Sequence, residues 1–266
     1  MRVQPVRRYT DPRYPAASAL DTHPELLRLL PRRWRSNSLV LAGLAATGGL
    51  LLAGCRPSWA DTFKGELKVA PIFTHGDGRG AFGCVAVNPP VFLSEEEARG
   101  VIIEEAKTAG IVFETDVLTL PEVRVPETTE NGSVLPDEGE EPRTKVRELK
   151  LDGTDRERRI SFEYVSQDDY EAWKADDGGP MSTVSSFDLI GTAKVLRDGL
   201  AVAHAAEDGT VAVLYDPMER YLEDTDQVAG GVDWQQAEKD AKERAKAQLR
   251  KQVKGFIEWL KAEGVI

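Results

Sequence analysis

The chain contains few of the residues that hold metals, form disulfides or act as nucleophiles. Its 266 residues include only two cysteines and three histidines. Motifs typical of zinc proteases, serine hydrolases and EF-hand calcium sites are missing, namely His-Glu-x-x-His, Gly-x-Ser-x-Gly and Asp-x-Asp-x-Asp-Gly. The sequence therefore predicts no cofactor and no metal site, and it leaves any catalytic residues unknown.

Basic residues are also in deficit. The chain has 34 Lys and Arg against 45 Asp and Glu, which gives a net charge of −11. Proteins that bind nucleic acid need a basic surface to neutralise the phosphate backbone. We therefore expect no nucleic-acid partner and no polybasic contact with anionic lipid.

A hydrophobic run long enough to span a membrane is missing as well. The most apolar segment, 39–53, is shorter than the roughly 20 residues that a transmembrane helix needs. It follows a basic flank that contains Arg28, Arg32, Arg33 and Arg35. A short apolar segment behind basic residues is typical of a signal peptide. An uncleaved N-terminal membrane helix is the alternative interpretation.

Leu52-Ala53-Gly54-Cys55 ends this segment and resembles the lipobox of bacterial lipoprotein precursors. The resemblance implies cleavage before Cys55, a diacylglyceryl group on its thiol and an acyl chain on its freed α-amine. Two or more acyl chains anchor a protein stably, because each buried CH₂ contributes roughly 0.8 kcal/mol. Arg56 stands where an inner-membrane retention signal has aspartate. In a cell with two membranes, we therefore expect the outer membrane, with the protein facing the periplasm.

The expected organisation is a signal peptide with a long n-region at 1–54, a lipidated tether at 55–65 and an acidic domain at 66–266. Removing 1–54 takes away eight arginines and three acidic residues, which leaves 26 basic and 42 acidic residues and a net charge of −16. Because lipid occupies Cys55, Cys84 has no partner for an intramolecular disulfide, and packing must stabilise the domain. Residues 121–143 contain four prolines and many carboxylates, which predicts an exposed acidic loop.

Helices are expected at four places in the mature domain. Ser94-Glu95-Glu96-Glu97 has the spacing of a capping box, so the first helix should run from there to about Ala109, with Gly110 as its left-handed stop. Shorter helices are expected at 168–174 and 187–196. A long C-terminal helix should begin near Asp233 and bury an apolar stripe, mainly along its second half.

Strands are expected at 67–73, 81–87 and 111–113, so that the first helix joins two strands in a β-α-β unit or an antiparallel return. An Asp152-Gly153 turn predicts a hairpin between 145–151 and 158–165. A second hairpin should join 200–205 to 210–215. These patterns predict a single α+β domain with an antiparallel-rich sheet, helices mostly on one face and a long C-terminal helix.

Four residues are candidate ligand-binding positions: His75, Asp77, Arg79 and Cys84. The glycine-rich loop 75–80 could bind an anion through its backbone amides with help from Arg79, but no helix follows it, and a flexible connection is favoured. Cys84 could be a nucleophile with His75 as its base, or form an intermolecular disulfide. Because it lies in an apolar run, we favour a buried hydrophobic role. Acidic pairs such as Asp168-Asp169 are interpreted as solvated turns.

The function that these observations favour is that of an exported, membrane-anchored protein without enzymatic activity. The membrane would be one partner, through the lipid on Cys55, and an envelope protein another. Two alternatives remain open at this stage. One is a periplasmic hydrolase that uses carboxylates or Cys84, and the other is a module that binds a small ligand or a cation.

Overall fold

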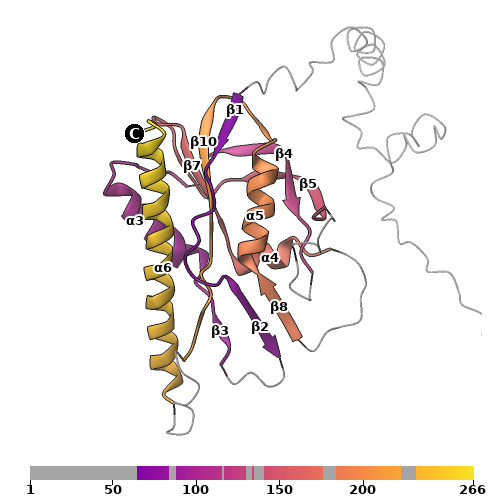
Figure 1. Ribbon diagram of the computed structural model, residues 1–266, viewed down its shortest axis with the longest axis vertical. Coiled ribbons are helices and arrows are strands. Elements are labelled where there is room, and N and C mark those ends of the chain that lie inside the picture. Colours follow the sequence, from indigo (N-terminus) through magenta and orange to yellow (C-terminus); the bar gives the residue numbers. More distant parts are fainter. Residues whose placement is uncertain are drawn as a thin grey trace, which may run out of the picture. The chain divides into compact units, whose positions relative to one another are not determined.

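A five-stranded sheet with the order β6-β7-β10-β1-β9 forms the centre of the fold (Figure 1). The computed structural model describes residues within one compact unit, Trp59–Ile266. The described residues are 65–83, 88–115, 117–129, 134, 141–175, 184–222 and 232–266. The predicted signal peptide, Cys55 and Cys84 lie outside them.

Parallel strands make up the middle of this sheet, because β1 and β7 both run parallel to β10. The edges are antiparallel, with β9 beside β1 and β6 beside β7. The strand bounds are β1 Gly65–Val69, β6 Gly153–Asp155, β7 Ile160–Val165, β9 His204–Ala205 and β10 Gly209–Tyr215. Every residue of β7 is buried. A strand buried on both faces requires cover on both sides of the sheet.

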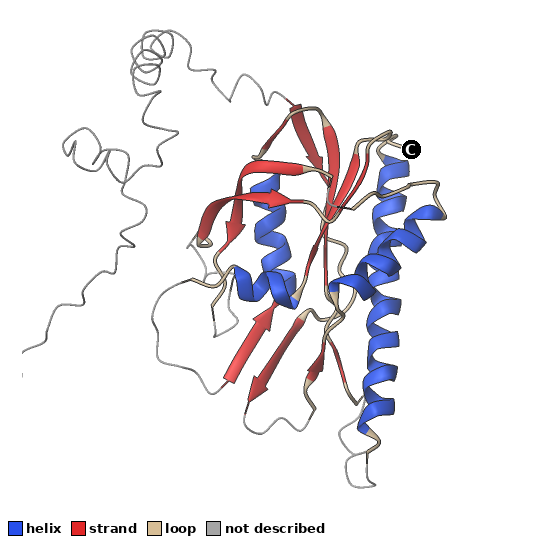
Figure 2. Cartoon of the chain, turned by 180° about the vertical axis from the view of Figure 1, so that it is seen from behind, coloured by secondary structure: helices blue, strands red, loops and turns tan. Residues whose placement is uncertain are grey.

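Helices provide that cover on both faces (Figure 2). Phe162 and Leu214 point into a core formed with α3 and α6, whereas Val165 and Val213 point into a second core formed with α5. A ribbon of β4 and β5 adds to the second core, and α4 lies beside it. The bounds are α3 Glu95–Lys107, α4 Gln167–Ala172, α5 Leu189–Leu200, α6 Trp234–Ala262, β4 Thr119–Pro126 and β5 Thr144–Lys150.

Two further antiparallel ribbons lie beyond the carboxyl ends of the parallel strands (Figure 1). One pairs β2 with β8, and the other pairs β3 with β11. Their bounds are β2 Arg79–Gly83, β8 Val184–Asp188, β3 Pro90–Val91 and β11 Glu219–Arg220. Loops that leave β1, β7 and β10 are therefore enclosed by additional structure at this end of the sheet.

The helices begin where side chains cap their first amides. Ser94 and Glu97 form the predicted capping box of α3. Ser166 and Asp169 form a second capping box at α4. Asp233 caps α6, and the buried positions of this 29-residue helix lie from Ala241 onward. The predictions for the first and last helices are thus confirmed, including the positive φ of Gly110.

The predicted α+β class, with mostly antiparallel pairing and a long C-terminal helix, is confirmed. Three finer points differ. The helices divide between both faces of the sheet rather than lying mostly on one. The first hairpin consists of β6 and β7 joined through 156–159, while β5 pairs with β4. The second predicted hairpin does not form, because β9 and β10 each pair with β1, which lies between them.

Residues 111–113 and 121–143 also differ from expectation. The segment after α3 is not a strand, although Ile111 and Phe113 are buried and Glu114 forms an isolated bridge with Thr154. Residues 121–126 belong to β4 rather than to an exposed loop, because Val123 and Val125 pack into the second core. Residues 130–133 and 135–140 of the predicted acidic loop lie outside the described part of the chain.

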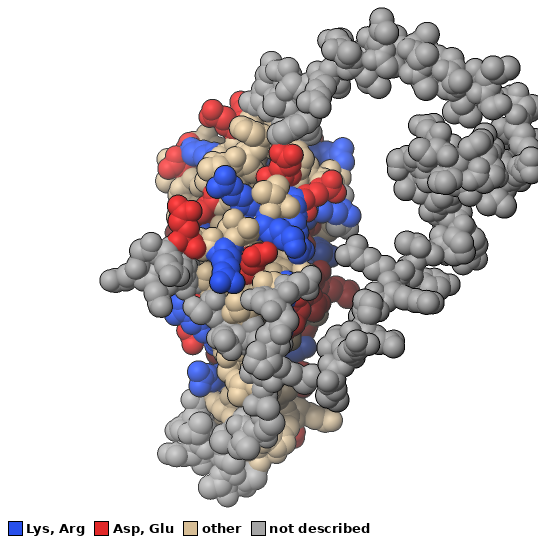
Figure 3. Space-filling model, turned by 90° about the vertical axis from the view of Figure 1, so that its right-hand side faces the viewer, with Lys and Arg blue, Asp and Glu red and all other residues tan. Residues whose placement is uncertain are grey.

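Surface charge is mixed in sign. On the face shown in Figure 3, acidic and basic side chains alternate without a broad field of one sign among the described residues. None of the described helices is both long enough and apolar enough to span a membrane.

Candidate functional site

The glycine-rich loop predicted as a ligand-binding segment is fixed by hydrogen bonds at the carboxyl end of β1. The His75 amide donates to the Tyr215 hydroxyl at 3.0 Å, and the His75 carbonyl accepts from Nε2 of Gln252 at 3.0 Å. The Gly78 amide donates to the Pro217 carbonyl at 2.9 Å. The loop is therefore a packed connection between strand ends and α6, not the flexible connection that the sequence favoured.

Two glycines allow this close packing. Gly76 and Gly78 have positive φ angles, 84° and 61°, which disfavour residues with a Cβ atom. A Cβ on Gly78 would lie 2.8 Å from the ring of Tyr215. Burial raises the pKa of Tyr215 to about 12, so its hydroxyl stays protonated and available to hydrogen-bond the loop.

Arg79 pairs with a carboxylate and does not line an open anion site. Its Nε donates to Oδ1 of Asp188 at 3.0 Å, and the same oxygen accepts the Gly191 amide at 2.9 Å. Asp188 is the N-cap of α5, so this ion pair joins β2 to the start of a helix. The side chain of Asp77 is exposed. Among the described residues, no hydrogen bond or ion pair joins His75, Asp77 and Arg79 to one another.

The letters Gly78-Arg79-Gly80-Ala81-Phe82-Gly83 match the Gly-x-Gly-x-x-Gly spacing of dinucleotide-binding loops. That motif binds pyrophosphate only where it joins a strand to the N-terminus of a helix. Here Arg79–Gly83 is strand β2 and pairs with β8. The spacing therefore carries no indication of a dinucleotide site.

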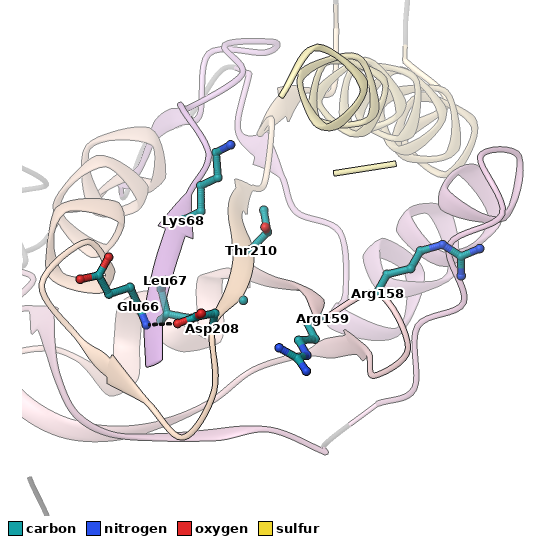
Figure 4. A pocket seen from close by; sticks show the side chains of 8 residues that line it. Glu66, Leu67, Lys68, Arg158, Arg159, Asp208 and Thr210 are labelled. Atoms are coloured by element: carbon teal, nitrogen blue, oxygen red, sulfur yellow. Dashed lines mark hydrogen bonds between the residues drawn. The ribbon is translucent and has the colours of Figure 1, made fainter. Parts of the chain in front are cut away.

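An open pocket of about 620 Å³ lies at the opposite, amino end of β1 and β10 (Figure 4). Its charged lining has both signs, and each of its basic residues has an acidic neighbour. Lys68 pairs with Glu263 at 2.7 Å, and Arg159 with Glu207 at 3.4 Å. The pocket is lined by Glu66, Leu67, Lys68, Arg158, Arg159, Asp208, Gly209 and Thr210. It is a shallow polar hollow whose charges are already balanced.

A cluster of four carboxyl groups is the most unusual chemical feature of the described structure. This carboxyl cluster gathers around the end of β7 and consists of Glu95, Asp152, Glu163 and Asp169. Its one guanidinium belongs to Arg99, which lies 3.2 Å from Asp152 and 3.7 Å from Glu95. Arg99 therefore contacts two of the four acidic groups.

The pKa values within the carboxyl cluster are raised. Burial, followed by the charges of Asp152 and Asp169, raises the pKa of Glu163 well above its usual range. Burial also raises the pKa of Asp169 to about 6 and that of Asp152 by a smaller amount. Nearby, burial raises the pKa of Asp216 to about 6, although the amides of Leu93 and Met218 donate to its carboxylate. Asp169 and Asp216 can therefore exchange protons close to neutral pH.

No local sequence pattern indicates this cluster. Asp168-Asp169 was interpreted as a solvated turn, but Asp169 caps α4 and is largely buried. Glu163 belongs to a segment with an alternating strand pattern. That pattern alone does not indicate that both faces of β7 are covered. Within the described part of the chain, no group of three or more His, Cys, Asp or Glu side chains is placed to hold a metal ion.

No protein family, no curated protein and no solved structure matches this chain. The site must therefore be interpreted from its own residues.

Proposed function

We propose that this protein is a lipid-anchored exported lipoprotein whose acidic α+β domain acts as a binding or envelope-associated module without enzymatic activity. The observation that carries the proposal is the basic flank, short apolar segment and lipobox-like Leu52-Ala53-Gly54-Cys55, which stand directly before a domain of net acidic charge. The described structure adds that the chain beginning at Gly65 belongs to one folded unit.

The non-enzymatic part of the proposal rests on how the candidate groups are used. His75 contributes its backbone to a packed loop, and Arg79 supports a helix cap through Asp188. The open pocket and the carboxyl cluster share no residue. Catalysis would require reactive groups at a surface that substrate can reach.

Nine residues, 56–64, lie between Cys55 and Gly65, the first residue of β1. A chain of that length spans at most about 35 Å when fully extended. A lipid on Cys55 would therefore keep the amino end of β1, which borders the pocket of Figure 4, within about 35 Å of the membrane.

Metabolic labelling with radioactive palmitate tests the anchor. We expect the wild-type chain to incorporate label and to fractionate with membranes. Cys55→Ala should abolish both, because the modified thiol is removed. Cys84→Ala is the matched control and should retain both. Label that persists in Cys55→Ala would exclude the proposed anchor.

The binding role needs a separate test. Crosslinking in intact envelopes, followed by mass spectrometry, should recover a specific protein partner with the wild-type chain. The Cys55→Ala chain should recover less of it, because that chain is not held at the membrane. Recovery of no specific partner from wild-type envelopes would contradict the binding role while leaving the anchor intact.

A further inference from the structure

The carboxyl cluster contains a buried carboxylate oxygen without a hydrogen bond. Glu163 is only 4% exposed, and its Oε2 atom is buried without a hydrogen-bond partner among the described residues. An ionised carboxylate in that position would cost several kcal/mol, and a buried group of this kind takes up a proton instead. Arg99 does not pair with it: the Arg99 guanidinium contacts Asp152 and Glu95, and its Nε atom is also buried without a hydrogen-bond partner among the described residues.

A second feature of the cluster is the hydroxyl of Ser166, the N-cap of α4, which lies between two carboxylates. Its hydroxyl is 2.7 Å from Oδ2 of Asp169 and 3.2 Å from Oε1 of Glu95. A hydroxyl has one hydrogen to donate, so only one of these carboxylates can receive it fully. If both carboxylates are ionised, they repel each other across the hydroxyl. Glu95 lies in the first turn of α3 and Asp169 in the first turn of α4, so this contact joins two helices.

Most cations of the surrounding elements are paired with carboxylates outside the cluster. Towards α6, Glu97 of α3 pairs with Lys242 at 3.0 Å and Lys246 at 3.6 Å. On α4, Glu171 pairs with Lys174. Arg99 of α3 and Tyr164 of β7 face the cluster, and Asp216, after β10, lies beside Tyr164. Arg99 is thus the one cation of the described structure in contact with the cluster.

We propose that the carboxyl cluster is a proton-operated latch, in which protons taken up by Glu163 and Asp169 hold α3 and α4 against the end of β7. Loss of these protons as the pH rises leaves uncompensated charge between the two helices and loosens their contact. A proton on Asp169 removes its repulsion with Glu95 across the Ser166 hydroxyl, which can then donate to Glu95.

The direction of the effect follows from linkage. The pKa values of Glu163, Asp169 and Asp152 are raised in the folded state, so the folded protein binds more protons than the unfolded chain at mildly acidic pH. Their contribution to stability is present in full below the unfolded values, near 4, and is lost as the pH rises through about 6 for Asp169. Stability should therefore increase as the pH falls from 7.5 to 5.5.

Thermal melting of the full chain tests this expectation. The wild-type Tm should be higher at pH 5.5 than at pH 7.5 by at least about 2 °C. Glu163→Gln imitates the protonated side chain, so it should raise the Tm at pH 7.5 and reduce the difference between the two conditions. Asp168→Asn removes an exposed charge beside the cluster and should leave the difference unchanged. A wild-type Tm that is equal or lower at pH 5.5 overturns the proposal.

Two further measurements separate a latch from a general pH effect. Infrared difference spectroscopy should detect a protonated carboxylic acid at pH 5.5 that Glu163→Gln removes and that weakens in the wild type as the pH rises to 7.5; its absence from the wild type at pH 5.5 overturns the assignment of Glu163. Hydrogen exchange, corrected for intrinsic rates, should slow at pH 5.5 in the first turns of α3 and α4 more than in α5. Equal slowing in all three helices contradicts a local latch.

Discussion

Gln252 is a polar residue within the apolar stripe of α6, and its amide group joins three segments of the fold. Its Oε1 accepts the Tyr215 amide at 3.1 Å, while its Nε2 donates to the carbonyls of Tyr215 and His75 at 3.0 Å. Because Gln252 is completely buried, the Tyr215 backbone groups that it contacts have no access to water as a substitute, whereas the His75 carbonyl is only partly buried. The side chain therefore stabilises the strand end and the glycine-rich loop together.

Gln252→Leu should lower the free energy of unfolding by about 2–4 kcal/mol, because it leaves buried backbone groups without partners. Urea denaturation followed by far-UV circular dichroism measures the change. Gln235→Leu, an exposed position in the first turn of the same helix, is the control and should change stability by less than about 0.5 kcal/mol. Equal effects of the two substitutions would show that the amide contacts contribute nothing specific.

At the scale of elements, sequence patterns predicted helices better than strand partners. The capping box at Ser94 and the cap at Asp233 are local signals, and both helices begin where these residues stand. Strand pairing depends on segments distant in sequence. The Asp152-Gly153 dipeptide predicts a turn, but Gly153 instead pairs with Phe162 as part of β6. Nothing in residues 200–215 shows that β1 lies between β9 and β10.

The carboxyl cluster could not be predicted for the same reason, because it depends on contacts between segments distant in sequence. A carboxyl cluster forms only when α3, β7 and α4 meet, and each of its members is an ordinary residue in its own segment. Glu97, three residues after Ser94, could be assigned to a cap from spacing alone. Glu163 could be recognised as unusual only once both faces of β7 were known to be covered. Predictions from local sequence patterns were correct, whereas those that depended on contacts between distant segments were not.

Alanine substitutions at two glycines should change the stability in opposite directions, because the two backbone conformations differ. Gly78→Ala should destabilise the protein by more than 1 kcal/mol, because φ is 61° and the added methyl group would meet Tyr215. Gly100→Ala, within α3, should stabilise it by about 0.5–1 kcal/mol, since no atom lies within 4 Å of the new Cβ. Thermal and urea melting of both variants measures the difference. Destabilisation by Gly100→Ala would contradict the open helix surface around that residue.

At the scale of the whole molecule, the first described strand connects a predicted tether with the middle of the sheet. β1 pairs with β10 on one side and β9 on the other, and Leu67 and Val69 pack against the second core. The next residue, Ala70, is fully buried in the first core, and its amide donates to the Val211 carbonyl at 2.8 Å. The strand that follows the proposed lipidation site is therefore also part of the folded core.

A truncated chain that begins at Pro71 should consequently fail to fold. Without β1, the apolar strand β10 becomes an unpaired edge and β9 loses its partner, so we expect aggregation in place of a cooperative melt. A chain that begins at Trp59 retains β1 and is the matched control. Size-exclusion chromatography and circular-dichroism melting distinguish the two. Equal melting midpoints would mean that β1 is dispensable, in which case a pull on the lipid anchor would not be transmitted to the core through this strand.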